Sequence, residues 1–318
     1  MTRKHQDTGL ASLATEQPNR RSADLDKKSS LDIARIINAE DTTVATAIKR
    51  ALPRIAQAID WIADALQDGG RLIYVGAGTS GRLAALDAAE CPPTFNIDSA
   101  KVQAIIAGGE KAFTGALEAE EDSRSAAIRE IRRRRVGQKD VVVGIAASGR
   151  TPFTVAALKA AKRAGARTIA ITSNPGTALE DSADLAIVIE TGPEIVCGST
   201  RMKAGTAQKM VLNMLSTGAM VKLGYVYGNL MVNMHRNNSK LAERSVRILR
   251  YALGDGGPAK SALKSAGNSL PVAIVMHEAN ARRDQAEKAL HKAKGNVRKA
   301  VELINHEGHE GARRQIRR

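Results

Sequence analysis

Arg71-Leu72-Ile73-Tyr74-Val75-Gly76-Ala77-Gly78-Thr79-Ser80-Gly81 joins an apolar run to a glycine-rich turn, and a helical stretch at residues 82–90 follows directly. Glycines at such a turn let backbone N–H groups approach a phosphate at the start of a helix. The letters also satisfy G-x-G-x-x-G, the fingerprint of dinucleotide-binding domains. Alone, the turn predicts a strand, a phosphate-binding loop and a helix, without deciding which phosphate compound binds.

The same strand–turn–helix design occurs a second time. The apolar run at residues 141–146 leads into Ala147-Ser148-Gly149-Arg150-Thr151-Pro152, where proline suits the first helical position because it needs no N–H partner. A third cluster, Ser199-Thr200-Arg201-Met202-Lys203, opens a later predicted helix and adds cations. Three such helix starts that converge would hold one phosphate monoester through charge-assisted hydrogen bonds. The candidate substrate-binding residues are Gly78, Thr79, Ser80, Ser148, Gly149, Thr151, Ser199, Thr200 and Lys203.

The turns favour a phosphorylated sugar over a dinucleotide. A dinucleotide site requires an acidic residue at the end of the next strand to hold the ribose hydroxyls. Here the next predicted strand, residues 102–107, ends in Gly108-Gly109, and Glu110 comes two residues late. No lysine of the P-loop type follows either glycine turn, which also disfavours nucleotide hydrolysis.

Strand and helix patterns alternate through the middle of the chain, which predicts an α/β fold with a doubly wound parallel sheet. Ligands of such sheets bind at the carboxyl ends of the strands. The predicted strands are residues 73–75, 102–107, 141–146, 168–172 and 185–189. The predicted helices between and after them are residues 81–90, 113–135, 152–164 and 202–223.

The two ends of the chain lack the alternating strand and helix patterns of the middle. Residues 1–30 are polar and lack periodicity, which indicates a flexible arm. Apolar residues recur at three and four over residues 31–67, which predicts two amphipathic helices divided near Asp41-Thr42-Thr43. After the phosphosugar-binding α/β domain at residues 68–230, residues 240–318 carry helical spacing with glycine breaks. We interpret them as a small C-terminal bundle, similar to ubiquitin-associated domains, that packs or stabilises a dimer.

Composition limits the classes of function. The 318 residues are 43% hydrophobic but only 3% aromatic, which suits helices on a parallel sheet. The chain shows neither a membrane span nor a signal peptide, so the cytoplasm is expected. Cys91 and Cys197 lie far apart without metal-ligand spacing, and we expect neither a disulfide, a metal nor a cofactor.

The net charge of +15 favours anionic partners and raises the question of nucleic-acid binding. The dense arginine run at residues 132–135 closes a predicted amphipathic helix, however, and no aromatic residues interleave with it. We interpret the run as a solvated helix end, so neither nucleic acid nor a membrane is an expected partner.

Four motifs together resemble the N-acetylmuramic acid 6-phosphate etherase family. That family has a sugar isomerase (SIS) domain and is related to the glucokinase regulatory protein, and the resemblance runs from about Thr15-Glu16 into the helical tail. The motifs are Gly76-Ala77-Gly78-Thr79-Ser80-Gly81-Arg82, Asp87-Ala88-Ala89-Glu90-Cys91-Pro92-Pro93-Thr94, Ala147-Ser148-Gly149-Arg150-Thr151-Pro152 and Ser199-Thr200-Arg201-Met202-Lys203-Ala204-Gly205-Thr206.

The resemblance implies a homodimeric carbon–oxygen lyase without a cofactor. It implies removal of D-lactate from N-acetylmuramic acid 6-phosphate, by elimination and hydration, to give N-acetylglucosamine 6-phosphate during cell-wall (peptidoglycan) recycling. Two alternatives stay open: an aldose–ketose isomerase acting on another phosphosugar, since both reactions remove a proton beside a carbonyl, and a non-catalytic phosphosugar sensor.

The elimination needs one base and one acid, a task suited to two carboxyl groups in different environments. Glu90 is predicted to end its helix before Cys91-Pro92-Pro93, where the helix dipole favours a protonated carboxyl. The resemblance implies that Glu90 is the proton donor. In Glu118-Ala119-Glu120-Glu121-Asp122-Ser123, spacing does not choose among the carboxylates, and the resemblance assigns the second catalytic glutamate to Glu121, as the base.

Two further features remain as hypotheses. Thr15-Glu16-Gln17-Pro18-Asn19 resembles an N-terminal motif of the family, and it either closes over the site or stays unstructured. His235 departs from the family pattern and is interpreted as a surface or structural histidine.

Overall fold

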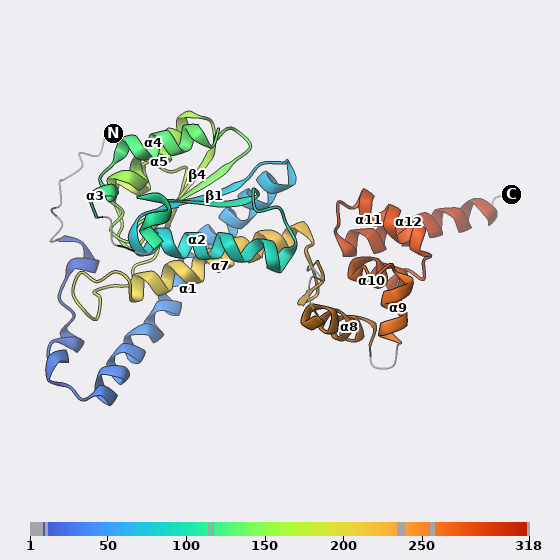
Figure 1. Cartoon of the computed structure of the whole chain (residues 1–318), viewed down its shortest axis with the longest axis horizontal. Helices are drawn as coiled ribbons and strands as arrows, with labels where there is room; N and C mark the ends of the chain where they lie inside the picture. Colours follow the sequence, from blue (N-terminus) through green and yellow to red (C-terminus); the bar gives the residue numbers. More distant parts are fainter. Residues whose placement is uncertain are drawn as a thin grey trace. The chain divides into compact units, whose positions relative to one another are not determined.

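A computed structural model describes residues 9, 12–113, 115, 118–233, 239–254 and 258–316. The chain forms two compact units, residues 1–89 with 99–218 and residues 90–98 with 219–318. The first unit contains the sheet and the site, and the second consists mainly of helices (Figure 1).

The sheet of the first unit has five parallel strands in the order β2-β1-β3-β4-β5. The chain leaves β1 toward β2 on one side and returns to β3 on the other, so the topological switch point lies between β1 and β3. A crevice at the carboxyl ends of the strands is expected there. The predicted doubly wound parallel sheet is therefore confirmed. The strands are β1 (Leu72–Gly76), β2 (Val102–Ile106), β3 (Val141–Ile145), β4 (Arg167–Thr172) and β5 (Leu185–Val188).

Helices cover both faces of this sheet (Figure 1). The alternate residues Ile73 and Val75 pack toward α4 (Arg124–Arg133) and α5 (Pro152–Arg163) in one buried cluster. On the opposite face, the buried Tyr74 hydroxyl donates to Asp87 of α2 (Gly78–Phe95) at 2.9 Å. Asn213 and Ser216 of α7 (Lys203–Leu223) donate to the same carboxylate. Burial on both faces explains why the strands are nearly continuous apolar runs.

The prediction of two N-terminal helices is wrong, because α1 is one continuous helix over Ser30–Gln67. Thr42 and Thr43 donate their hydroxyls back to the carbonyls of Ala39 and Glu40, at 2.7 Å each, so these residues are satisfied inside the helix. Ser29 accepts from the N–H of Asp32 and caps the start.

Helix α2 also differs from its predicted end at Glu90. It continues to Phe95 with Pro92 and Pro93 inside it. Each proline lacks the N–H that would bond four residues back, but the helical hydrogen bonding resumes at once, since the N–H of Asn96 donates to the carbonyl of Pro92 at 2.8 Å. Glu90 therefore lies within a helix rather than at its C-terminus.

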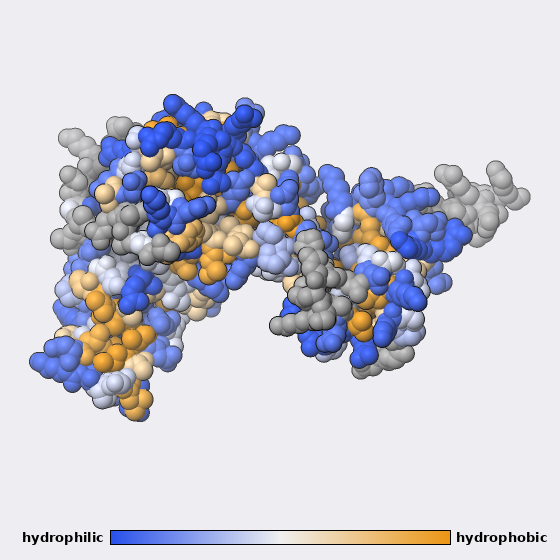
Figure 2. Space-filling view, in the orientation of Figure 1, coloured by the Kyte–Doolittle hydropathy of each residue, from blue (hydrophilic) through white to orange (hydrophobic). Residues whose placement is uncertain are grey.

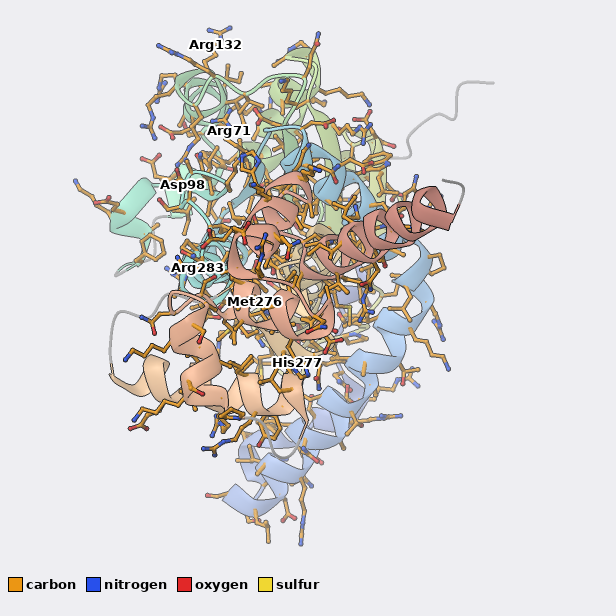
Figure 3. All side chains as sticks on the ribbon, turned by 90° about the vertical axis from the view of Figure 1, so that its right-hand side faces the viewer. Arg71, Asp98, Arg132, Met276, His277 and Arg283 are labelled. Atoms are coloured by element: carbon orange, nitrogen blue, oxygen red, sulfur yellow. The ribbon has the colours of Figure 1, made fainter. Side chains whose placement is uncertain are left out.

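The predicted helix at residues 113–135 is broken into shorter pieces. The described parts are a 3-10 helix, η5 (Gly109–Phe113), then α3 (Glu118–Glu121) and α4. Ser123 accepts from the N–H of Ala126 and starts α4 afresh. At the far end Arg132 is exposed at the outer edge of the unit (Figure 3), whereas Arg134 packs on β2 and donates to the carbonyl of Ala104.

The segment predicted as a flexible arm contains short 3-10 helices in its described part. They are η2 (Ala14–Glu16), η3 (Arg20–Ser22) and η4 (Leu25–Lys27). Thr15 is fully buried and accepts from the side-chain amide of Asn174 at 3.1 Å. The hydroxyl of Ser22 donates to the carbonyl of Ile195 at 2.7 Å. Individual hydrogen bonds and the buried side chains of Leu13 and Thr15, rather than an apolar period, hold this segment.

The second unit has its own buried apolar core. A short antiparallel pair, β6 (Val226–Tyr227) and β7 (Leu230–Met231), precedes the helices. The helices are α8 (Ser239–Leu253), α9 (Ala259–Ser265), α10 (Leu270–Glu278), α11 (Arg283–Lys292) and α12 (Val297–Ile316). Within the described part of the chain, no helix combines the length and apolarity that a membrane crossing needs.

Candidate active site

A pocket of about 300 Å³ opens at the switch point of the sheet. The turns after β1 and β3 both reach it, as do the start of α7 and the N-terminal segment. Seven of the predicted site residues line it: Gly78, Thr79, Ser80, Glu121, Ser148, Thr151 and Thr200. The hydroxyl-bearing turns that sequence treats separately are thus brought together in one cavity.

Two glycines of the first turn are required by close approaches of the backbone. A Cβ at Gly76 would lie 2.9 Å from the backbone nitrogen of Gly81. A Cβ at Gly81 would lie 2.6 Å from Ile106 of β2. The turn therefore folds tightly onto the sheet, and α2 begins with its N–H groups toward the pocket, where they suit an anion.

Gly78 brings the predicted base to this turn. Its φ of +51° is left-handed, and a Cβ there would lie 2.9 Å from Oε1 of Glu121. Glu121 ends the short helix α3 and is half-buried, while the adjacent Glu120 is exposed. The structure thus distinguishes two carboxylates that the sequence pattern leaves equivalent. Glu121 faces the glycine-rich turn after β1, and Glu120 faces solvent.

The second turn is shaped by Gly149, which does not itself line the pocket. Its φ is +67°, and a Cβ there would lie 2.6 Å from Cβ of Thr177. This close packing lets Ser148 and Thr151 face the cavity. Pro152 occupies the first turn of α5, as predicted. The Oγ of Ser148 accepts from the N–H of Arg150 at 3.2 Å, which orients the hydroxyl.

The third turn contributes less than expected. Thr200 lines the pocket, but Ser199 and Lys203 are not among its described lining residues. Glu194 accepts from the backbone N–H groups of Lys203 and Ala204, at 2.8 and 2.9 Å, so a carboxylate of the protein already occupies the start of α7. This helix start is therefore unavailable to a substrate phosphate in the arrangement described.

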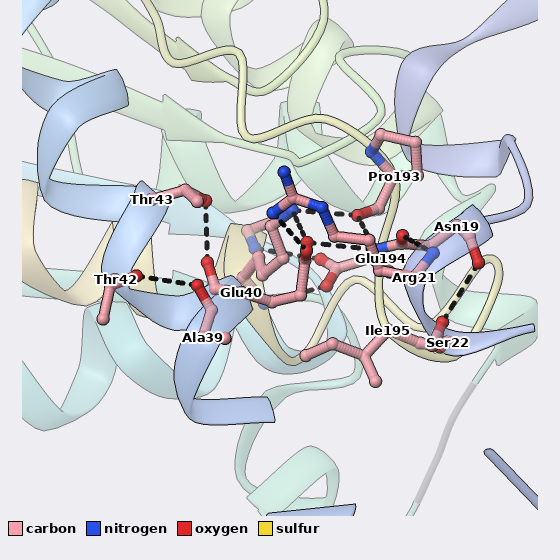
Figure 4. Close-up of polar contacts among 12 residues, drawn as sticks. Asn19, Arg21, Ser22, Ala39, Glu40, Thr42, Thr43, Pro193, Glu194 and Ile195 are labelled. Carbon is pink, nitrogen blue, oxygen red and sulfur yellow. Dashed lines mark hydrogen bonds and ion pairs between the residues drawn. The ribbon is translucent and has the colours of Figure 1, made fainter. Parts of the chain in front are cut away.

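The ammonium of Lys203 is committed to a buried ion pair with Glu40. Figure 4 shows Glu40 beside Asn19 and Arg21 of the N-terminal segment. The ammonium lies 2.7 Å from Oε2 of Glu40 on α1 and donates to the carbonyl of Pro193 at 3.0 Å. Lys203 is 3% exposed and Glu40 is 4% exposed. Asn19 and Arg21 of the N-terminal segment also donate to Glu40. Lys203 thus has a structural partner, which does not favour a direct role on substrate.

The two buried glutamates of this cluster have opposite pKa shifts. Burial alone would raise the pKa of Glu40, but hydrogen bonds from Lys203, Asn19 and Arg21 outweigh it and hold the pKa below its ordinary value. Burial dominates at Glu194 and raises the pKa of that carboxyl despite its two backbone hydrogen bonds. The cluster ties three elements together: the N-terminal segment, α1 and the start of α7.

The N-terminal motif reaches the pocket through Glu16, which lines it. Burial of Thr15 fixes the position, and the exposed Cys197 donates its thiol to the carbonyl of Glu16 at 3.2 Å. A Cβ at Gly198 would lie 3.2 Å from Oε2 of Glu16. Of the two possibilities left by the sequence, the structure has the segment lying against the site.

The predicted acid, Glu90, is not among the described residues that line this pocket. It is exposed and lies twelve residues after Gly78 on α2, which is about 18 Å along a straight helix. His235 lies outside the described residues. Of the two predicted catalytic carboxylates, Glu121 is the one found among the described residues that line the pocket.

Arg82 is a pocket residue whose ligand-binding capacity is not evident from the sequence pattern. Arg82 belongs to the first turn motif. The sequence pattern, however, indicates only the glycines and hydroxyl residues of that motif as ligand-binding groups. The Arg82 side chain donates to the carbonyls of Ala112 and Gly115, at 2.8 and 2.9 Å, and lines the cavity. Across the described residues, no group of three or more metal-ligating side chains is found.

The fold and pocket together define a class, the sugar isomerase (SIS) domain proteins. Residues 126–218 match the profile of the SIS domain, and residues 54–162 match the glucokinase regulatory protein N-terminal SIS domain. The chain is 47% identical over 295 residues to N-acetylmuramic acid 6-phosphate etherase 1 of Bacillus licheniformis, covering 92% of this chain and 97% of the relative. It is 49% identical over 294 residues to the N-acetylmuramic acid 6-phosphate etherase of Escherichia coli O1:K1, covering 92% and 99%. The chain belongs to the N-acetylmuramic acid 6-phosphate etherase family.

Solved structures with some likeness are more distant. A phosphoheptose isomerase from Neisseria gonorrhoeae has a TM-score of 0.48 at 19% identity, covering 60% of this chain and 98% of the other. A phosphoheptose isomerase from Francisella tularensis has a TM-score of 0.47 at 19% identity, covering 61% and 100%.

Proposed function

We propose that this protein cleaves the D-lactyl ether of N-acetylmuramic acid 6-phosphate with water, giving N-acetylglucosamine 6-phosphate and D-lactate. The observation that carries the proposal is the position of Glu121 against Gly78, inside a pocket lined by Thr79, Ser80 and Ser148. Hydroxyls and helix N–H groups suit a phosphate, and a carboxylate beside them suits proton removal from the attached sugar.

The reaction proceeds by elimination and hydration. Opening of the sugar ring exposes an aldehyde at C1 and acidifies the hydrogen on C2. A base removes this proton, the C2–H electron pair becomes the C2–C3 double bond, and the C3–O bond breaks as the lactate oxygen takes a proton. Water then adds its oxygen at C3 while C2 regains a proton. The enzyme is by this chemistry a carbon–oxygen lyase.

We assign the base to Glu121 and the acid to Glu90. Support for Glu121 is its position in the pocket. Support for Glu90 is the resemblance of its motif. Because it lies about 18 Å along α2 from Gly78, we propose that it acts on the substrate of a partner subunit. Glu16 is a second carboxylate lining the pocket, so it is the rival acid within one chain.

A homodimer is part of the proposal. Leu31 is 59% exposed, and Ile33, Ile36 and Ile37 are only half-buried, so the first turns of α1 present an apolar stripe. Figure 2 shows hydrophobic surface gathered over this half of α1. A stripe of this kind is typical of a surface that a second subunit covers.

We further propose that the enzyme acts in the cytoplasm, in the recycling of peptidoglycan sugars. Support for this compartment comes from Cys91 and Cys197, neither of which forms a disulfide.

The test is release of D-lactate from N-acetylmuramic acid 6-phosphate by the purified protein, measured with a D-lactate dehydrogenase coupled to NADH formation. We expect stoichiometric D-lactate and N-acetylglucosamine 6-phosphate. Failure to form lactate by a protein that binds the substrate would refute the enzymatic function.

A further inference from the structure

The guanidinium of Arg82 is a positively charged group that hydrogen bonds hold in place on one wall of the pocket. Its Nε donates to the carbonyl of Ala112 at 2.8 Å and its Nη2 to the carbonyl of Gly115 at 2.9 Å. These two bonds fix the plane of the guanidinium and leave three of its five N–H groups without a partner among the described residues. The side chain is half-buried and is the one cation among the described residues that line the pocket.

This cation has no acidic partner in the described part of the chain. Its hydrogen-bond acceptors there are backbone carbonyls, which satisfy N–H groups but carry no formal negative charge. The pocket also carries the carboxylates of Glu16 and Glu121, which oppose the entry of any further negative charge. A ligand with a second anionic group would therefore be drawn to the Arg82 wall of the cavity.

The proposed substrate has two anionic groups on different carbons. The phosphate is at C6, and the lactyl carboxylate is attached through oxygen at C3. Hydroxyls and N–H groups of Thr79, Ser80 and Ser148 are suited to the phosphate. Arg82 lies one helical turn beyond Gly78 on α2, about 6 Å along its axis, which separates it from the start of the helix.

We propose that Arg82 binds the carboxylate of the lactyl group and so selects sugar phosphates that carry this ether. The inference rests on the proposed function. The N–H groups on Nη1 and Nη2 form the end-on fork that pairs with a carboxylate through two parallel hydrogen bonds. Removal of the lactyl group takes away the ligand of Arg82, so the product loses this contact while keeping its phosphate contacts.

The test compares binding of two ligands by calorimetry. Substrate binding is measured in a Glu121→Gln background, which prevents turnover, and N-acetylglucosamine 6-phosphate provides the ligand without a carboxylate. In that background, Arg82→Gln should weaken substrate binding by about tenfold or more and change N-acetylglucosamine 6-phosphate binding by less than about twofold. Arg82→Lys keeps the charge but loses the fork, and should fall between the two.

The matched control is Arg132→Gln, which removes an exposed arginine and should change neither affinity. An equal loss for both ligands would overturn the proposal, because Arg82 would then serve the phosphate or only support the turn at residues 109–115. Unchanged substrate affinity would overturn it as well. Either result leaves D-lactate release by the unmodified protein untouched, so failure of this inference is distinguishable from failure of the proposed function.

Discussion

Glu121 lies directly over Gly78: a Cβ at position 78 would approach Oε1 of the carboxylate to 2.9 Å. The contact joins the start of α2 to the end of α3, and it depends on the absence of a side chain at position 78. Gly78, which shapes the glycine-rich turn after β1, thus also leaves room for the proposed base.

Gly78→Ala should lower kcat by at least about tenfold, because displacing the base by a fraction of an ångström disturbs its alignment with C2. The matched control is Gly176→Ala. Gly176 has a similar φ of +66° but nothing within 4 Å of a Cβ, so it carries the backbone strain without the contact. Both variants should lose about 1–2 kcal/mol of stability by chemical denaturation. Equal kcat values for the two variants would contradict the role of the contact.

The two proposed catalytic carboxylates should differ in hydrogen exchange. Glu121→Ala should lose both lactate release and exchange of the C2 proton in deuterated water, because the base is gone. Glu90→Ala should lose lactate release but retain C2 exchange, measured by NMR. Glu16→Gln serves as the comparison for the rival acid and should retain lactate release. Equal exchange in the Glu90 and Glu121 variants would rule out these assignments.

Mixing two inactive variants tests whether partners share a site. With Glu121 from one subunit and Glu90 from the other, a heterodimer of Glu90→Gln and Glu121→Gln chains has one intact site. Random reassociation makes half of the dimers heterodimers, so about a quarter of the unmodified activity should return. If both carboxylates come from one chain, the mixture should stay inactive. The readout is lactate release after joint unfolding and refolding, with each variant refolded alone as the control.

The buried pair of Glu40 and Lys203 should make stability depend on acid. The folded-state pKa of Glu40 is below its ordinary 4.5, so the folded state binds this proton less readily than the unfolded state. The contribution of Glu40 is therefore complete above about pH 4.5 and is lost as the pH falls through the lower folded value.

Glu40→Gln should cost about 3 kcal/mol at pH 7, since it leaves Lys203 buried with a broken pair. Urea denaturation between pH 3 and 7 measures this, and the difference from the unmodified protein should shrink toward acid pH. Arg35→Gln is the control, because it breaks an exposed pair with Asp32 and should change stability much less than Glu40→Gln does. A pH-independent difference for Glu40→Gln would show that the charge is not responsible.

The sheet and its turns were predictable because each is fixed by local chemistry. Apolar runs such as 141–145 must be buried on both faces, and glycines before a helix mark the crossover turns. Convergence of the Gly78 and Ser148 turns also follows, because β1 and β3 are neighbours at the switch point. The choice of Glu121 as the base depends on the family resemblance. Residues 118–121 share one short helix, so their spacing does not distinguish one carboxylate from another.

Other features depend on contacts between distant residues. The charge of Lys203 suggests a phosphate ligand, and nothing nearby in the sequence reveals its pairing with Glu40, 163 residues away. Thr42 and Thr43 resemble a helix break until their hydroxyls are seen to bond inside α1. Pro92 resembles a stop for α2 because local preference opposes a helix that continues through it.

Docking of the N-terminal segment has a consequence for synthesis of the chain. Thr15 leaves the ribosome well before its partner Asn174, which comes 159 residues later, and the bond from Ser22 to Ile195 spans 173 residues. Domains fold as they are made, from the N-terminus onward. The segment that carries Glu16 cannot dock until the strands and turns that hold its partners have been synthesised. This wall of the pocket is therefore translated first and assembled last.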